Sequence, residues 1–194
     1  MSQPDEPFAR FHQVLTEAEA AGIEDPNAMV VSSVSAEGQP SSRVVLLKGF
    51  DERGFVFYTN LESRKGTEIR GNGRVALNFH WRALGKQVVV LGVASQVDDE
   101  EADEYFATRP RGSQLGAWAS QQSRPLASRA HLVAAVAKLE ARWLGRPIPR
   151  PPHWSGFRVA PHWIEFWVAG RFRLHDRIAY EPTDEGWRSM RLNP

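Results

Sequence analysis

Five short segments between residues 28 and 97 constrain the fold more than any other feature of the chain. Residues 28–34, 43–48, 55–60, 75–81 and 87–97 are rich in Val, Phe and Leu, and the stretches AEGQP, DERG, GNG and RALGK between them carry turn residues. A single short helix is expected at 64–70. The other connections are too short for crossover helices, so the pattern predicts an antiparallel meander or barrel and not parallel βαβ units.

Helical patterns flank this strand-rich region on both sides. Pro7 opens a segment with apolar residues at helical spacing, and Gly22 closes it. From Asp98 the pattern turns helical again, and Pro110 is expected to end that helix and start a second short one. Residues 126–144 are predicted to form the longest helix, with an apolar stripe.

Two further strands, 157–168 and 171–180, precede the loop EPTDEG and a last strand, WRSMRL. No internal repeat, low-complexity tract or linker interrupts the chain. We therefore predict one α+β domain over residues 1–194, which strands 157–194 complete.

Composition excludes several classes of function. Lys and Arg (24) nearly balance Asp and Glu (23), so net charge gives no reason to expect nucleic acid. Cysteine is absent, which excludes disulfides, thiol nucleophiles, iron–sulfur clusters and thiolate zinc sites. No apolar run reaches membrane-spanning length, and the start MSQPDEPFAR does not resemble a secretory signal. A soluble, cytoplasmic protein without a membrane or nucleic-acid partner is the expectation.

Basic residues lie in two of the expected strands. In RFRLHDRIAY, alternation places Arg171, Arg173, His175 and Arg177 on one face, where they suit an anion or, alternatively, form a solvated edge strand. In SRVVLLKGF, Arg43 and Lys48 are five residues apart, which puts them on opposite faces of a regular strand. A shared ligand would therefore need a bulge, a strand end or a site that wraps around the sheet, and the alternative is two separate cations at strand ends.

Two other stretches carry groups suited to phosphate. YTNLESRKG places Tyr58, Thr59, Ser63, Arg64 and Lys65 at a strand-to-helix turn, where hydroxyls, backbone N–H groups and cations can cradle an anion, although helix starts are often polar.

The stretch RPRGSQLGAWASQQS follows Tyr105. Tyr105 and Arg109 lie four apart on one helix face and Ser113 follows, so this trio could hold a second phosphate. The polar residues Gln121, Gln122 and Ser123 suit the edge of a heterocycle, whereas Trp118 is better interpreted as core.

Other chemistries lack their motifs. The chain has no G-x-G-x-x-G after a strand, no G-x-x-x-x-G-K-[ST], no G-x-S-x-G and no metal-binding spacing among its six histidines. Without an obvious acid, base or nucleophile, the chemistry is expected to belong to an organic cofactor.

Taken together and in order, the motifs SRVVLLKGF, FVFYTNLESRKG, KQVVVLG, YFATRPRGSQLGAWASQQS, IEFW, RLHDR and RLNP resemble the pyridoxamine 5′-phosphate oxidase family from about residue 8 to 194. The resemblance implies a split β-barrel homodimer with FMN in two clefts between subunits. The implied FMN contacts are Arg43, Val45, Leu46, Lys48, Tyr58, Thr59, Arg64, Lys65, Gln87, Gln122, Ser123, Trp167 and Arg177. The implied substrate contacts are Lys48, Tyr105, Arg109, Ser113, Arg173 and His175, with Arg173 and His175 as the catalytic pair over the reacting carbon.

The implied reaction oxidises pyridoxamine or pyridoxine 5′-phosphate to pyridoxal 5′-phosphate, with O2 as acceptor, H2O2 as product and NH3 released from the amine. Two departures from the family pattern are expected to matter. Members often carry a longer N-terminal segment that helps cover the active site, whereas this chain starts just before its first expected helix, so weaker closure over the substrate and slower or less selective turnover are expected. Ser155 stands where the family usually has a second glycine, a change expected to be tolerated.

Two alternatives remain open. One is a phenazine-biosynthesis oxidase or flavin reductase on the same barrel, against which the trio Tyr105, Arg109 and Ser113 argues. The other is a non-catalytic protein that binds FMN or pyridoxal phosphate, against which Arg173 and His175 argue.

Overall fold

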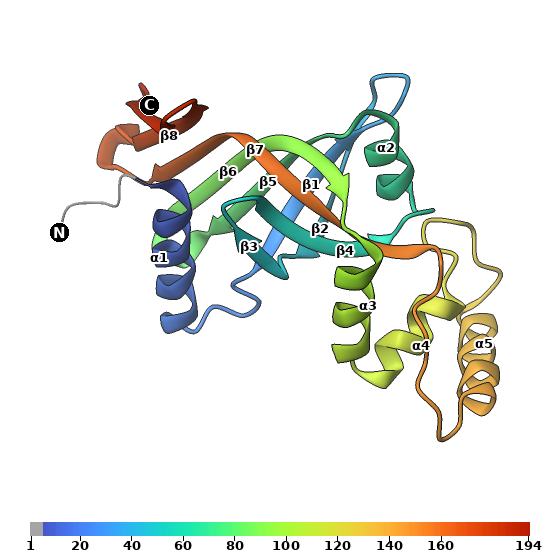
Figure 1. Cartoon of the computed structure of the whole chain (residues 1–194). Helices are drawn as coiled ribbons and strands as arrows, with labels where there is room; N and C mark the ends of the chain where they lie inside the picture. The colour runs from blue at the N-terminus through green and yellow to red at the C-terminus, as the bar shows by residue number, and fades with distance from the viewer. Residues whose placement is uncertain (1–5) are drawn as a thin grey trace.

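The computed structural model describes residues 6–194, and within them nine strands form one antiparallel sheet that curves into a half-barrel (Figure 1). Seven strands follow the order β2-β1-β5-β6-β7-β4-β3, and β8 and β9 extend the sheet from β7. The strands are β1 (Ala28–Val34), β2 (Pro40–Leu46), β3 (Gly49–Asp51), β4 (Gly54–Asn60), β5 (Arg74–Trp81), β6 (Lys86–Gln96), β7 (Trp154–Val168), β8 (Asp176–Thr183) and β9 (Gly186–Arg191).

Five α-helices accompany this sheet: α1 (Pro7–Ala20), α2 (Arg64–Asn72), α3 (Asp99–Thr108), α4 (Arg111–Ala119) and α5 (Arg129–Arg142). Helix α1 lies at one end of the barrel, whereas α3, α4 and α5 lie together at the other end (Figure 1). None of the helices in the described part of the chain is long and apolar enough to cross a membrane.

The connectivity is not the simple meander that the sequence allowed. Strand β4 pairs with β7 along six residues, from Phe55 opposite Val159 to Asn60 opposite Trp154, and β5 pairs with β1 instead of β4. The 15-residue β7 pairs with β4, β6 and β8 and so closes the half-barrel. These pairings join segments far apart in the chain, which short-range turn signals do not specify.

The main core lies between α1 and the inner face of the sheet. The fully buried Phe11 packs its ring within 5.0 Å of the Phe50, Phe55 and Phe79 rings, centroid to centroid. Helix α1 begins as expected, with the Glu6 carboxylate accepting a hydrogen bond from the backbone N–H of Ala9.

A second, smaller core joins α3, α4 and α5 to the start of β7. Its buried members are Phe106, Leu115, Trp143, Ile148 and Trp154. Trp118, expected in the core, packs against this cluster and donates a hydrogen bond to the carbonyl of Pro149 at 2.7 Å. This core therefore positions the segment that carries Tyr105, Arg109 and Ser113.

The prediction of one longest helix at 126–144 was wrong in extent. Helix α5 begins only at Arg129, because the Ser128 hydroxyl accepts a hydrogen bond from the backbone N–H of His131. It is 14 residues long, which is the length of α1. No residue of α5 is fully buried, so its apolar stripe packs only partly.

The prediction of a continuous strand at 171–180 was also wrong. Residues Arg171–Arg173 form a single 3-10 turn, and β8 starts only at Asp176. Phe172 and Arg173 both have left-handed backbones, with φ of 57° and 64°. The four basic residues from Arg171 to Arg177 therefore do not share one strand face, because the period of two holds only in extended chain.

Candidate active site

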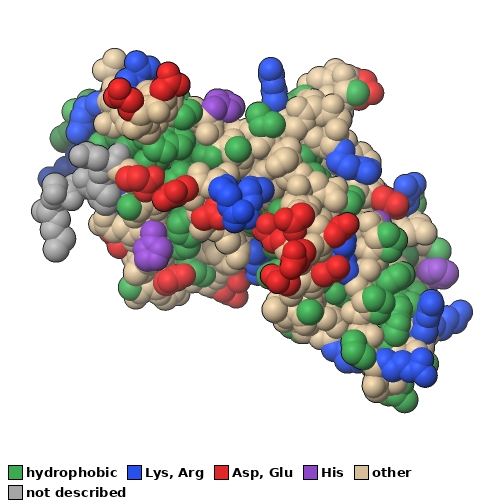
Figure 2. All heavy atoms as spheres, in the orientation of Figure 1, with side chains coloured by type: hydrophobic (Ala, Val, Ile, Leu, Met, Phe, Trp, Pro, Cys, Tyr) green, Lys and Arg blue, Asp and Glu red, His purple; other side chains and the backbone are tan. Residues whose placement is uncertain are grey.

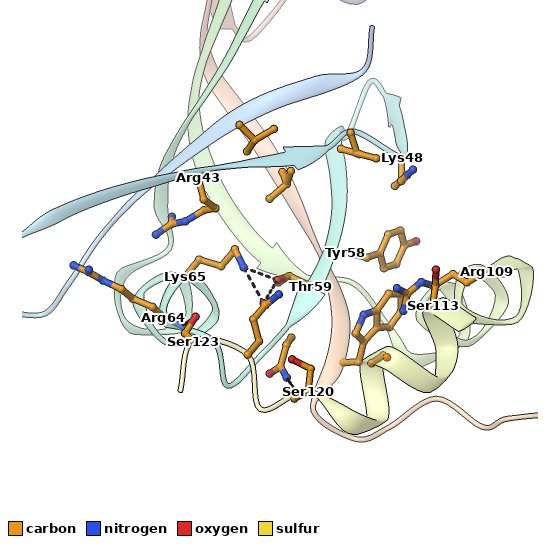
Figure 3. Close-up of a pocket in the computed structure, with 18 of the residues that line it drawn as sticks. Arg43, Lys48, Tyr58, Thr59, Arg64, Lys65, Arg109, Ser113, Ser120 and Ser123 are labelled. Carbon is orange, nitrogen blue, oxygen red and sulfur yellow. Dashed lines mark hydrogen bonds between the residues drawn. The ribbon is translucent and has the colours of Figure 1, made fainter. Parts of the chain in front are cut away.

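A cavity of about 840 Å³ lies where β2, β4 and α2 face α3 and α4 (Figure 3). Thirteen of the residues singled out from the sequence line it: Arg43, Val45, Leu46, Lys48, Tyr58, Thr59, Arg64, Lys65, Tyr105, Arg109, Ser113, Gln122 and Ser123. The sequence analysis did not single out Ser41, Ser42, Asn60 or Ser120, which also line it. The cavity thus brings together three separate stretches of the chain.

One end of the cavity is built around Lys65, in the first turn of α2. Its ammonium donates hydrogen bonds to Gln122 Oε1 at 2.9 Å and Thr59 Oγ1 at 3.0 Å, and within residues 6–194 it pairs with no carboxylate. Burial, and then the nearby positive charge of Arg43, lower the pKa of Lys65 to about 8. A buried cation surrounded only by neutral oxygens is poised for an anionic ligand.

The local sequence explains why this end is rich in donors. The Ser63 hydroxyl caps α2 by accepting a hydrogen bond from the backbone N–H of Gly66 at 3.2 Å. The backbone N–H of Arg64 donates to Ser123 Oγ at 3.2 Å, which fastens the segment after α4 to the helix start. A cation, a helix N-terminus and two hydroxyls therefore converge here.

Glu68 is a buried carboxylate that the sequence analysis missed. It accepts hydrogen bonds from the Ser33 and Ser41 hydroxyls, both at 2.6 Å, and forms ion pairs with Arg64 at 2.9 Å and Arg43 at 3.5 Å. Burial alone would raise its pKa, but these hydrogen bonds and the charge of Arg43 lower the pKa to about 2. Its spacing of four residues from Arg64 on α2 was the available signal.

The other end of the cavity is an aromatic stack with a cation against it. The rings of Tyr58, Tyr105 and Trp154 are nearly parallel and cluster together, with centroids 4.0 Å apart for Tyr58 and Tyr105 and 5.3 Å apart for Tyr58 and Trp154. The Arg109 guanidinium lies 4.6 Å from the Trp154 ring centroid, and its buried Nη1 has no hydrogen-bond partner among the described residues. An unpaired buried N–H on a permanent cation is a second position that an anion would satisfy.

Tyr58 stays a neutral phenol at physiological pH. Burial, followed by the negative charge of Glu101, raises its pKa to about 12. Its hydroxyl can therefore donate a hydrogen bond but does not supply a negative charge to the cavity.

Helix α3 is held against the sheet by ion pairs to two arginines. Arg158 of β7 bonds Glu101 at 3.0 Å and Asp51 at 3.0 Å, and Arg150 bonds Asp99 at 2.7 Å and Asp103 at 2.5 Å. These acids gather over α3 in Figure 2. Because Tyr105 and Arg109 lie at the far end of the same helix, these pairs fix where they sit.

Arg43 and Lys48 both line the cavity, although their spacing placed them on opposite faces. Strand β2 ends at Leu46, so Lys48 lies beyond it, where its backbone N–H donates to the Val56 carbonyl at 2.8 Å. Both side chains can therefore line one cavity because a strand end lies between them, and alternation holds only within a continuous strand.

The remaining five candidates lie elsewhere in the same chain. Gln87 and Arg177 flank Trp167 as cross-strand partners on β6 and β8, and the Trp167 ring lies 4.5 Å from the His175 ring. Arg173 is exposed on the neighbouring turn. In Figure 1 this end of the sheet, with β8, lies far from α4 and α5. One chain therefore carries two separate halves of the predicted site.

The fold and the cavity define an antiparallel split-barrel protein with a pocket equipped for anionic, aromatic ligands. The chain belongs to the pyridoxamine 5′-phosphate oxidase family. Residues 15–143 match the family model described as "Pyridoxamine 5'-phosphate oxidase". Residues 154–194 match the model "Pyridoxine 5'-phosphate oxidase C-terminal dimerisation region", which indicates a homodimer.

Relatives named pyridoxine/pyridoxamine 5'-phosphate oxidase are similar along the whole chain. The one from Myxococcus xanthus (strain DK1622) is 56% identical over 191 residues, covering 98% of this chain and 93% of its own. That from Agrobacterium fabrum is 53% identical, covering 100% and 95%.

Solved structures of similar proteins share the fold. PhzG from Burkholderia lata 383, in complex with tetrahydrophenazine-1-carboxylic acid, superposes with a TM-score of 0.93 at 35% identity, covering 98% of this chain and 94% of its own. An FMN-binding protein from Nostoc punctiforme has a TM-score of 0.76 at 15% identity, with full coverage of both chains, and shows likeness of fold alone.

Proposed function

We propose that this protein is an FMN-dependent oxidase that converts pyridoxamine or pyridoxine 5′-phosphate to pyridoxal 5′-phosphate. One observation carries the proposal: a single cavity holds the buried cation Lys65 and the half-buried cation Arg109, and no carboxylate neutralises either of them within residues 6–194. Figure 3 shows them at opposite ends. Two anions are thus expected in one cavity, one at each end, as the phosphates of a cofactor and a substrate would be.

The Lys65 end fits the phosphate of FMN. Arg43, Arg64 and Lys65 supply positive charge, and Ser123 and the start of α2 supply neutral donors. Glu68 holds the two arginines in place without neutralising Lys65. When bound there, FMN would supply the electron acceptor, and O2 would reoxidise it with release of H2O2.

The Arg109 end fits the phosphate of the substrate. A guanidinium stacked on Trp154 is already oriented, so little side-chain entropy is lost when it binds a phosphate bidentately. Tyr105 and Ser113 add hydroxyls beside it, and Lys48 adds a second cation from the opposite wall. The stack of Tyr58 and Tyr105 gives a flat apolar surface suited to a pyridine ring.

We propose further that two copies of the chain complete each site. Gln87, Trp167 and Arg177 would reach FMN from the second copy, and Arg173 and His175 would lie over the reacting carbon and position the substrate. Residues 1–194 would act as one domain, because strands from both family regions belong to one sheet.

The proposed reactions balance with O2 as the oxidant and, for the amine, one water molecule. The alcohol loses a hydride and a proton to give the aldehyde, and O2 takes up both electrons and protons as H2O2. The amine loses the same equivalents to give an imine, and water then releases NH3 and the aldehyde.

A second candidate is the oxidation of a carboxylated heterocycle, because PhzG resembles this chain along almost its full length. Arg109 could bind a carboxylate as well as a phosphate. Peroxide production with pyridoxamine 5′-phosphate, unphosphorylated pyridoxamine and a reduced phenazine carboxylic acid separates the two. Turnover of the phosphorylated vitamer alone supports the proposal, whereas turnover of the phenazine alone supports the second candidate.

A further inference from the structure

The turn between β7 and β8 holds a phenylalanine out in solvent. Phe172 is 92% exposed and Leu174 is 70% exposed, on either side of Arg173. The described residues include no other large apolar side chain as exposed as Phe172. A partner surface in the assembled protein that removed this side chain from water would gain hydrophobic free energy.

The backbone that presents Phe172 is strained and tightly held. Phe172 and Arg173 adopt consecutive left-handed conformations, which L-residues other than glycine avoid. Gly170 lets the turn close, because a Cβ there would lie 1.8 Å from the Leu174 carbonyl oxygen. Its backbone N–H donates to His175 Nδ1 at 3.2 Å, and the Leu174 N–H donates to the Arg171 carbonyl at 3.0 Å. Strain of this kind persists where the conformation serves a function.

The position of the turn identifies its partner. It lies within the residues that match the dimerisation region, at the end of the sheet far from its own 840 Å³ cavity (Figure 1). Under the proposed function, Arg173 must therefore reach the cavity of a second copy. Because Phe172 is the residue before Arg173, its side chain would reach the second copy's cavity together with that of Arg173.

The cavity wall on α4 has room for an aromatic ring. Gly116 and Ala117 line the cavity, and a Cβ added to Gly116 or to Gly112, one turn earlier, would meet nothing within 4 Å. A helix face without large side chains beside the Tyr105 and Tyr58 stack is complementary to a projecting phenyl group.

We propose that Phe172 of one copy packs against the α4 wall of the other copy's cavity, near Gly116 and Ala117, and closes the substrate end against water. It is a positioning residue for Arg173, and its aromatic ring is the anchor of the turn. The inference rests on the proposed function, which it deepens by adding a residue to the shared site.

Cross-linking tests the contact without substrate. The chain has no cysteine, so the double variant Phe172→Cys/Ala117→Cys contains only the two thiols of interest. Under mild oxidation it should form covalent dimers on a denaturing gel, while each single variant should stay monomeric. Asp184→Cys/Ala117→Cys is the matched control, because Asp184 lies at the tip of the neighbouring β8–β9 hairpin. Absence of covalent dimers, or equal cross-linking of the control pair, would overturn the inference.

Kinetics test the consequence for the site. Phe172→Asn relieves the backbone strain, because asparagine tolerates the left-handed region, so a loss of function cannot come from a misfolded turn. We expect its KM for pyridoxamine 5′-phosphate to rise about tenfold or more and its kcat to fall, because Arg173 would lie over the reacting carbon, with FMN affinity within about twofold of the parent. Phe172→Trp should keep a KM close to that of the parent.

An unchanged KM in Phe172→Asn would overturn the inference even with an active enzyme. The two proposals fail separately. Cross-linking without any oxidation of the vitamer would contradict the function and keep the contact, whereas turnover without cross-linking would do the reverse.

Discussion

The Lys65 ammonium lies 2.9 Å from Gln122 Oε1, a contact that ties the start of α2 to the segment following α4. Lys65 has no carboxylate partner within residues 6–194, and burial together with Arg43 lowers its pKa to about 8. Its protonation should therefore be coupled to the arrival of a phosphate.

The first prediction is a pH-dependent affinity for FMN. Above about pH 8 the free protein has a neutral Lys65, and binding of a phosphate must return the proton, so FMN affinity should fall by up to about tenfold per pH unit. Between about pH 8 and 10 the unfolded chain holds more protons than the folded one, so the FMN-free protein should gain stability as pH rises. Flavin fluorescence titrations between pH 7 and 9.5 measure the affinity. Lys65→Arg, charged throughout, should flatten the curve, and a flat curve for the parent would count against the account.

The second prediction separates the two phosphate positions. Arg109→Ala should weaken substrate binding at least about 30-fold, as expected for a lost charge-assisted pair worth roughly 2–5 kcal/mol, and leave FMN affinity nearly unchanged. Arg64→Ala should do the opposite, with weakened FMN retention as its main defect. Equilibrium dialysis of FMN and KM measurements under saturating FMN distinguish them. Loss of flavin from Arg109→Ala with normal KM would show that the two ends are assigned the wrong way round.

The third prediction concerns Glu68. Glu68→Gln removes the charge that holds Arg43 and Arg64, so the FMN-free protein should lose about 2–3 kcal/mol of unfolding free energy near pH 7. Because the folded-state pKa is about 2, the contribution of Glu68 is present above about pH 4.5 and is lost as pH falls toward 2. Urea unfolding at several pH values checks both points. Glu37→Gln is the control, since Glu37 is exposed and contacts Ser35 but no cation. Equal effects of the two variants would contradict the role given to Glu68.

The fourth prediction follows from the division of the site between two ends of the chain. Arg109→Ala and Arg173→Ala homodimers should each be nearly inactive at low substrate. Mixing them through a denaturation and refolding step should restore about a quarter of parental activity, because half the dimers are mixed and each has one intact site. No recovery from a mixture that sedimentation shows to contain mixed dimers would mean that each site is built from one chain.

The fifth prediction concerns Ser155, at the position where a glycine was expected from the family pattern. It is fully buried opposite Thr59, and its hydroxyl has no hydrogen-bond partner within residues 6–194. Ser155→Ala should therefore stabilise the protein by about 1 kcal/mol, whereas Ser155→Gly should gain less, because glycine weakens a strand by roughly 0.5–1 kcal/mol. Thermal unfolding of the parent and both variants measures these differences, and a Ser155→Ala variant less stable than the parent would show that the hydroxyl is hydrogen-bonded in solution.

Local signals predicted much of the sheet and one half of the site. The start of α1 at Pro7 and the strand at 28–34 follow from capping and alternation, which act over a few residues. The residues expected around Lys65 and around Arg109 line the same cavity, and most members of each group are close together in the sequence, although Gln122 and Ser123 join the Lys65 end from another stretch.

Contacts between segments far apart in the chain could not be predicted from local sequence patterns. The pairing of β4 with β7 joins residues about a hundred positions apart, and Glu68 acquires its role only when β1 and β2 bring Ser33 and Ser41 to it. The stretch RFRLHDR alternates like a strand, but the contact of Gly170 with Leu174 folds it into a turn. Residue spacing likewise could not show that the two halves of the site lie far apart in one chain.

The most direct test of the proposed function is a visible spectrum of the protein, reconstituted with FMN, desalted and kept free of oxygen. On addition of pyridoxamine 5′-phosphate, the account predicts that the flavin bands bleach and return when air is admitted, with H2O2 and pyridoxal 5′-phosphate formed in equal amounts. Flavin bands that persist unchanged with this substrate would contradict the proposed oxidase.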